Sequence, residues 1–351
     1  MNPLKFIGPR IIKTGISVFI TAIVCMKLNL PVIFAVITAI VTTEPTAAES
    51  LKRGIIRLPA AAIGASFALI FDMFLGHGAL TFALVSMMTI LFCHRLKLDN
   101  VTLVATLTAV AMIPISNESI LSEFILRLSG TSLGIIISTL VNFAVLPPKF
   151  GPLLVQKVNQ LYVNTAKHLE QIISSIVEEK ELNLDVTTRD LHQELDKAFK
   201  ISDYQEAEWQ YRKTNELEER SFHFLQRKLA QLQRIIFHVG NLSYITINKD
   251  FSPDEKKVVL TSVEFIINLC TNVLQHNQKS VSYAQEQLYE LLKKEIQDKA
   301  MYQQKGAFLH ELLAILECLS VVQQATLAEH FFSENNKNYP GYIFGKQIQY
   351  D

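Results

Sequence analysis

The strongest constraint on the fold of this chain is an internal repeat, because residues 11–80 and 81–150 align without a gap at a shift of 70 positions. Each copy holds three apolar segments, and an odd number of membrane crossings would place the second copy upside down relative to the first. The sequence therefore predicts two inverted three-helix repeats. The matched polar and glycine positions include Lys27 with Lys97, Asn29 with Asp99, Arg57 with Arg127, and Gly64 with Gly134.

Apolar segments are concentrated before residue 147 and predict a membrane domain at residues 1–150. Several are shorter than the ~20 apolar residues that cross ~30 Å of hydrocarbon, which favours a packed bundle over independent spans. The cluster Pro147-Pro148, followed by Gly151-Pro152, ends the last segment and predicts a domain boundary. The predicted spans are Ile11–Met26, Pro31–Thr43, Leu58–Leu75, Ala79–Cys93, Val101–Ile115 and Leu128–Leu146.

The charge distribution orients this bundle. Residues 1–150 carry 11 Lys+Arg and 6 Asp+Glu, which leaves 22 and 27 of the chain's 33 and 33 for residues 151–351. With the N-terminus inside, all basic residues of the first part except Lys27 and Arg127 fall on the cytoplasmic side, as the positive-inside rule requires. An even number of spans then returns the chain to the cytoplasm.

The second half predicts a cytoplasmic α-helical domain at residues 151–351. Apolar residues recur there at helical spacing, from Val155 to Leu327, with charged and amide residues between them. Ser252-Pro253-Asp254-Glu255 has the composition of a helix start. We expect a bundle of about five or six helices, with residues 178–220 as a connector or as longer exposed helices.

Two arginines are candidates for binding an anionic substrate. Arg57 and Arg127 are equivalent in the repeat, and the apolar pattern places them at the start of spans three and six. A guanidinium beside the positive end of a helix dipole suits a carboxylate. The alternative for Arg57 is a cytoplasmic anchoring charge, whereas Arg127 breaks the positive-inside bias.

The end of span two supplies the other candidates. Thr43 and Glu44 follow an apolar stretch of only about 13 residues, and interrupted short helices in both halves point to a midplane site in inverted-repeat transporters. Glu44 is a candidate proton-coupling group, because a poorly solvated carboxyl can exchange a proton near neutral pH. The alternative is a helix-end glutamate in cytoplasmic water. Gly64 and Gly134 are expected to allow close helix packing.

The sequence lacks the motifs of several classes of enzyme and binding site. The sequence shows no Walker loop, no nucleophile elbow and no His/Cys cluster at metal-ligand spacing. The balance of charge in the second half is acidic, which argues against nucleic acid as a partner. We therefore predict neither an enzyme nor a cofactor or metal site.

At Thr43-Glu44-Pro45-Thr46, Ser50-Leu51, the Arg57/Gly64 and Arg127/Gly134 sets, and the Leu146-Pro147-Pro148 end before a long helical tail, the chain resembles the bacterial aromatic acid exporter family. That family is related to fusaric acid resistance proteins and plant malate channels. The resemblance implies a multi-pass protein of the bacterial plasma membrane that moves organic anions, in particular aromatic carboxylates, outward. Larger members look like two six-span units, so a homodimer of this chain would restore their count.

A second interpretation remains open at the level of sequence. The spans could tether a helical scaffold or sensor whose acidic bundle binds a cytosolic protein. The internal duplication favours transport, because a tether needs no inverted symmetry.

Overall fold

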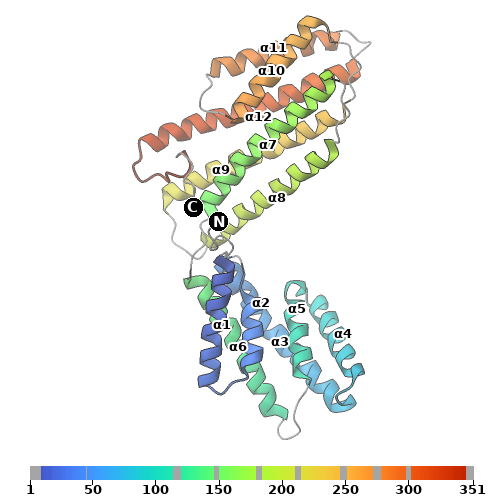
Figure 1. The fold of residues 1–351 in the computed structure, drawn as a ribbon, viewed down its shortest axis with the longest axis vertical. Helices are drawn as coiled ribbons and strands as arrows, with labels where there is room; N and C mark the ends of the chain where they lie inside the picture. Colours follow the sequence, from blue (N-terminus) through green and yellow to red (C-terminus); the bar gives the residue numbers. More distant parts are fainter. Residues whose placement is uncertain are drawn as a thin grey trace, which may run out of the picture. The chain divides into compact units, whose positions relative to one another are not determined.

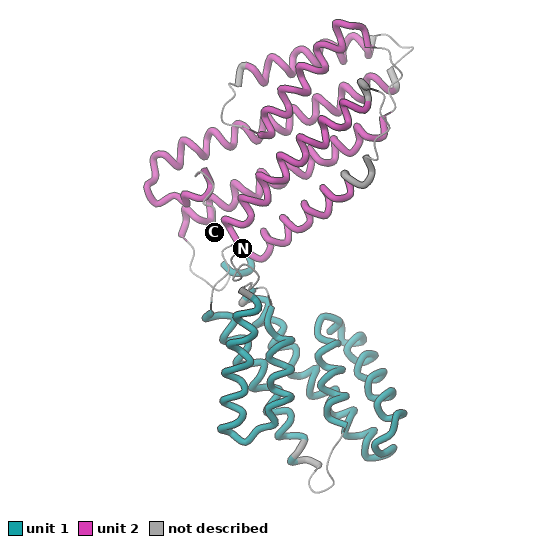
Figure 2. Tube along the Cα trace, in the orientation of Figure 1, with its two compact units in different colours: residues 1–148, 206–212 teal, residues 149–205, 213–351 magenta. Residues whose placement is uncertain are grey.

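The computed structural model describes residues 9–44, 46–113, 120–145, 150–178, 184–209, 215–245, 251–271, 278–297 and 302–344. Within these ranges every regular element is a helix, with twelve α-helices and one short 3-10 helix (Figure 1). The all-α prediction is confirmed for this part of the chain. The chain divides into two compact units, unit 1 (residues 1–148 with 206–212) and unit 2 (residues 149–205 with 213–351) (Figure 2).

Six α-helices make up unit 1, and three of them agree closely with the apolar pattern. Helices α1, α2 and α4 begin and end within two residues of the predicted spans, because apolar runs there are bounded by polar or turn-forming residues. The helices are α1 (Pro9–Lys27), α2 (Val32–Thr42), α3 (Ala47–Leu75), α4 (Ala79–Arg95), α5 (Thr102–Met112), which follows the 3-10 helix η2 (Asp99–Val101), and α6 (Ile120–Ala144).

The predicted starts of spans three and six are wrong. Helix α3 begins at Ala47, with Thr46 as its N-cap, and not at Leu58. The first three turns of α3 carry charged residues, so a pattern of apolar residues detects only the later part of the helix. Pro59 consequently lies inside α3 and not in its first turn, where it deprives the carbonyl of Ile55 of its helical donor.

The packing of unit 1 exchanges one helix between its two halves. Helices α1 and α2 pack against each other and against α6, whereas α4 and α5 pack against each other and against α3 (Figure 1). The third helix of each half therefore covers the first two helices of the other half. Helices α3 and α6 also contact each other and join the two groups.

Two long helices of unit 1 are apolar and poorly covered by protein. Ala48–Leu75 and Phe124–Ala144 are long and apolar enough to cross a membrane, and only 28% and 33% of their most apolar windows are buried. Shorter apolar helices surround them at Val32–Thr42, Ala79–Arg95 and Asp99–Met112. Exposed apolar surface of this extent in a chain of this composition indicates a membrane protein.

Unit 2 contains six further helices around an aliphatic core. Buried leucines and isoleucines on α7, α9 and α12, such as Leu161, Leu232 and Leu312, form the centre of this core. Helix α10 starts at Pro253, where the Glu255 carboxylate accepts a hydrogen bond from the backbone N–H of Ser252, as the sequence predicted. The helices are α7 (Phe150–Glu178), α8 (Leu184–Trp209), α9 (Glu216–Ser243), α10 (Pro253–Thr271), α11 (Gln278–Gln297) and α12 (Tyr302–Glu334).

Helix α12 is a third helix that could cross a membrane by length and composition, over Gln304–Glu334. In unit 2, however, 56% of its most apolar window is buried, because α9, α10 and α11 pack against it. Its apolar residues already have protein partners, which distinguishes α12 from the apolar helices of unit 1.

Candidate functional site

A buried ion-pair cluster occupies the link between α2 and α3. The Arg57 guanidinium donates through Nη2 to Glu44 Oε1 at 2.5 Å, and Arg53 donates through Nη1 to Glu44 Oε2 at 3.1 Å. Only 9% of Glu44 and 3% of Arg57 are exposed. Arg53 also pairs with Glu49, one turn earlier on the same helix. Glu44 therefore lies in a buried ion-pair network and not at a solvated helix end.

Local sequence explains why Glu44 has this position. Helix α2 ends at Thr42, and the Thr43 hydroxyl donates back to the carbonyl oxygen of Ala39 at 3.2 Å. The Thr46 hydroxyl then caps α3 by accepting the backbone N–H of Glu49 at 3.0 Å. Glu44 stands between these two helix ends, where the chain turns toward Arg57.

Two residues that we did not predict fix this link to the neighbouring helices. Lys13 of α1 donates to Asn142 Oδ1 of α6 at 2.9 Å, and Asn142 Nδ2 donates to the carbonyl oxygens of Glu44 and Thr46 at 3.0 and 2.9 Å. Lys13 is 4% exposed and Asn142 is fully buried. An asparagine inside the apolar run of α6 was the available signal, because a polar group buried in a membrane helix is costly unless it is bonded.

The cluster carries an excess of positive charge and unused donors. Arg53 and Arg57 pair with the carboxylates of Glu44 and Glu49, while Lys13 bonds to Asn142, so the formal charges of these five described residues sum to plus one. Within the described residues, Arg57 Nε and Nη1 are buried without a hydrogen-bond partner. Such groups normally find an acceptor, and leaving one unsatisfied costs about 1–3 kcal/mol.

Buried hydroxyl groups without partners lie on the helices around Arg57. Among the described residues these are Ser17 and Thr21 of α1, and Ser138 and Thr139 of α6. A Cβ at Gly54, one turn before Arg57, would lie 3.2 Å from Thr139 Oγ1, so α3 and α6 are in close contact here. Helix α6, which contacts both α1 and α3, thus carries buried hydroxyl groups that are able to donate to an anion or to water.

Arg127 occupies a different environment. Its Nη1 donates to the carbonyl oxygens of Ala111 and Met112 at 3.3 and 3.0 Å, and its guanidinium lies 5.2 Å from the centre of the Phe34 ring. Arg127 therefore caps the C-terminal end of α5. The structure brings Thr43, Glu44 and Arg57 together and places Arg127 outside this cluster.

Neither arginine begins its helix, contrary to the sequence-based expectation. Arg57 lies ten residues after the first residue of α3, and Arg127 seven residues after the first residue of α6. The positive ends of these two helix dipoles are therefore too distant to assist either guanidinium. Instead, each arginine reaches the C-terminal end of the short helix that precedes its own helix in the chain.

The two glycines lie at equivalent close contacts between helices. A Cβ at Gly64 would lie 2.9 Å from the carbonyl oxygen of Ala105, and one at Gly134 would clash with the carbonyl oxygen of Ala35. Ala35 and Ala105 are themselves related by the shift of 70 positions. Any side chain at either glycine would push α5 away from α3, or α2 away from α6.

The exposed apolar helices of unit 1 define the class of this chain as a membrane protein. The family described as aromatic acid exporter family member 1 matches residues 5–145. UPF0421 protein BH2644 of Halalkalibacterium halodurans is 42% identical over 98% of this chain and 96% of its own length. A UPF0421 protein of Bacillus cereus is 39% identical over 96% and 99%, and UPF0421 protein SSP0904 of Staphylococcus saprophyticus is 35% identical over 90% and 96%.

The chain belongs to the aromatic acid exporter family, among its UPF0421 proteins. The family resemblance drawn from the sequence is thus confirmed. Membership in a transporter family, together with the apolar helices of unit 1, indicates a membrane protein.

Proposed function

We propose that the chain exports organic anions, in particular aromatic carboxylates, across the bacterial plasma membrane. Unit 1 is the transport domain, with six spans in two inverted repeats and both termini in the cytoplasm, and the helices of unit 2 form a cytoplasmic bundle. The observation that carries this proposal is the buried Arg57, which has two donors without partners in a cluster of net positive charge. A substrate carboxylate would supply the missing acceptor.

The matched contacts of the two halves support the repeat. The pairs Gly64 with Ala105 and Gly134 with Ala35 are related by the same shift of 70 that aligns the sequences. Exchange of the third helices places α3 and α6 against each other at the centre of unit 1. A site on Arg57 of α3 therefore lies between the two halves, where alternating access requires it.

The membrane potential is a sufficient driving force for export. Moving one negative charge out of an inside-negative cell releases about 2.3 kcal/mol per 100 mV. The alternative driving force is a proton gradient acting through Glu44, whose carboxylate pairs with Arg57.

The test is flux of labelled benzoate in proteoliposomes under an imposed potential. Arg57→Gln should lower flux at least about tenfold, because a charge-assisted hydrogen bond is worth about 1.5–3 kcal/mol. Arg57→Lys, which keeps the charge, should retain part of the flux. Arg127→Gln is the matched comparison, and we expect it to lower thermal stability more than flux per folded molecule.

Three outcomes separate the alternatives. Unchanged flux in Arg57→Gln would remove Arg57 from the mechanism. Equal loss in Arg57→Gln and Arg127→Gln, with both proteins folded, would place both arginines on the path. A scaffold that binds a cytosolic protein would be favoured by two results together: no flux under any gradient, and cellular function supplied by unit 2 on an unrelated membrane anchor.

A further inference from the structure

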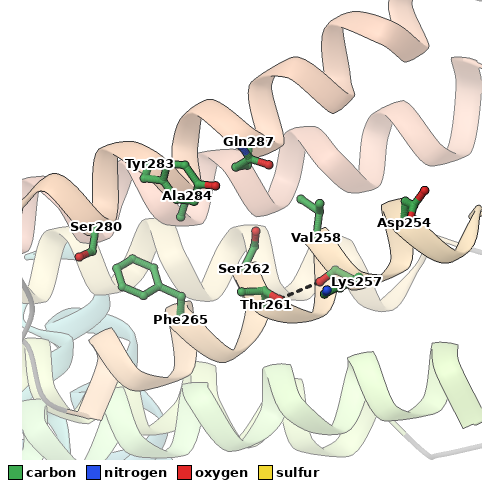
Figure 3. Close-up of a pocket in the computed structure, with 10 residues that line it drawn as sticks. All are labelled: Asp254, Lys257, Val258, Thr261, Ser262, Phe265, Ser280, Tyr283, Ala284 and Gln287. Carbon is green, nitrogen blue, oxygen red and sulfur yellow. Dashed lines mark hydrogen bonds between the residues drawn. The ribbon is translucent and has the colours of Figure 1, made fainter.

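Unit 2 contains a groove of about 670 Å³ between α10 and α11 (Figure 3). This volume lies within the range of about 300–1,000 Å³ that is typical of small-molecule sites. The helices leave space because small side chains face each other at the floor, where Ser262 of α10 and Ala284 of α11 are buried. The groove is therefore built into the packing of the two helices.

One end of the groove is aromatic. Phe265 and Tyr283 lie near Ser280 at this end, as Figure 3 shows. Tyr283 is 64% exposed, which is unusual for a large side chain beside a cavity. A ligand ring bound against Phe265 would give Tyr283 an apolar surface to pack on. Aromatic pairs contribute about 0.5–1.5 kcal/mol of stabilisation beyond that from the burial of apolar area.

The other end of the groove carries a cation without a partner. Lys257 has no side-chain hydrogen bond or ion pair within the part of the chain that the structure describes. Asp254 also lines this end, but it stands in the first turn of α10, where the helix dipole stabilises a carboxylate. Lys257 is exposed at this end of the groove, where its side chain can reach a carboxylate.

Polar groups in the middle of the groove are able to donate or accept hydrogen bonds. The Ser262 side chain is only 3% exposed, and no hydrogen bond of its hydroxyl occurs among the described residues. Gln287 lies across the groove from Ser262 and also has no side-chain partner among them (Figure 3). Donors between an aromatic end and a cationic end match a ligand that carries a ring and an anionic group.

We propose that this groove binds a small aromatic carboxylate, with its ring against Phe265 and Tyr283 and its carboxylate toward Lys257. Binding stands on the groove alone, whereas the idea that bound ligand reports the cytoplasmic level of the exported compound rests on the proposed function. Unit 2 would then act as the sensor of the transporter.

The test is equilibrium binding of radiolabelled 2-naphthoate to the purified full chain that carries Arg57→Gln, so that the proposed site in unit 1 does not contribute. We expect saturable binding of one ligand per chain. Lys257→Gln should weaken it about tenfold, since a charge-assisted hydrogen bond is worth about 1.5–3 kcal/mol. Lys256→Gln, at an exposed neighbour that does not line the groove, is the matched control and should change the affinity less than twofold.

Three more variants test the assignment. Asp254→Asn should tighten binding several-fold, because it removes a negative charge from the carboxylate end of the groove. Ala284→Phe fills the floor and should abolish binding, with thermal unfolding as the check that the bundle is intact. Ser262→Ala, which removes one donor and leaves the volume, should weaken binding without abolishing it.

The outcomes distinguish this proposal from the proposed function. Absence of saturable binding in folded Arg57→Gln protein, or equal effects of Lys257→Gln and Lys256→Gln, would overturn the groove as a carboxylate site. Binding in the groove without flux in proteoliposomes would count against export and leave the groove proposal standing.

Discussion

Replacing Gly134 by alanine tests the packing of the exchanged helices most directly. The new Cβ would lie 3.1 Å from the carbonyl carbon and 3.2 Å from the Cα of Ala35, with the carbonyl oxygen of Ala35 closer still. These neighbours are backbone atoms of α2, so they cannot move by rotating a side chain. Either α2 must shift away from α6, or the contact must remain strained.

The expected magnitude follows from two opposing terms. Overpacking costs about 1–3 kcal/mol, and contact with backbone places Gly134→Ala toward the upper end of that range. Alanine gains about 1 kcal/mol over glycine in a helix. The net loss is therefore about 1–2 kcal/mol. Gly15→Ala is the control, because no atom lies within 4 Å of its added Cβ, and it should gain about 0.5–1 kcal/mol.

The assay is heating of the detergent-purified chain followed by size-exclusion chromatography of the surviving fraction. A difference of about 1.5–3 kcal/mol between Gly134→Ala and Gly15→Ala corresponds to a gap of roughly 5–10 °C in midpoint. Gly64→Ala, whose Cβ would lie 2.9 Å from the carbonyl oxygen of Ala105, should fall below Gly15→Ala as well. A midpoint for Gly134→Ala at or above that of Gly15→Ala would refute the close contact of α2 with α6.

Three other changes have defined signs in thermal unfolding of the full chain. Asn142→Leu removes the side-chain acceptor of Lys13 and the donor to the carbonyl oxygens of Glu44 and Thr46, and it should cost about 2–4 kcal/mol, because buried polar groups lose these hydrogen bonds. Burial lowers the pKa of Lys228 to about 8. The charged form therefore destabilises the fold below pH 8, and this loss of stability fades as the pH rises toward 10.5. Lys228→Met should raise the unfolding midpoint at pH 7, and raise it less above pH 9. Burial raises the pKa of Glu255, but hydrogen bonds from Lys305 and Ser252 outweigh it and hold the pKa at about 2. This stabilisation is therefore present above pH 4.5 and lost as the pH falls toward 2. Lys305→Met should reduce that acid dependence, and the Ser252 hydrogen bonds should preserve the rest.

Periodicity of apolar residues predicted the helices of both units well where an apolar run and a helix coincide. It failed at α3, because the first turns of that helix are occupied by Glu49, Arg53 and Arg57. Both arginines pair with Glu44, and Glu49 pairs with Arg53. A pattern of hydrophobicity cannot distinguish a charged helical segment inside a membrane bundle from a loop. The position of a helix start depends here on its cap, Thr46, and on tertiary ion pairs.

The candidate site was predictable in part for the same reason. Glu44 and Arg57 were visible as charges beside apolar segments, but their pairing across thirteen positions depends on how α2 turns into α3. Lys13 was read only as a basic residue that sets orientation. Its bond to Asn142 joins residues 129 positions apart, and one sequence contains no signal for such a distant pair.

The two halves of unit 1 use equivalent arginines for different purposes, and one sequence position explains the difference. The shift of 70 aligns Glu44 with Pro114, which has no side-chain acceptor. Arg57 can therefore pair with a carboxylate after α2, whereas Arg127 donates to the backbone carbonyls that end α5. A guanidinium that caps a helix end is fixed by the fold, while one paired with a carboxylate can exchange that partner for a substrate anion or lose it when a proton binds. Among the contacts of the described residues, the pair of Arg57 with Glu44 offers a cation that can exchange its partner, and we expect an anion to be selected there.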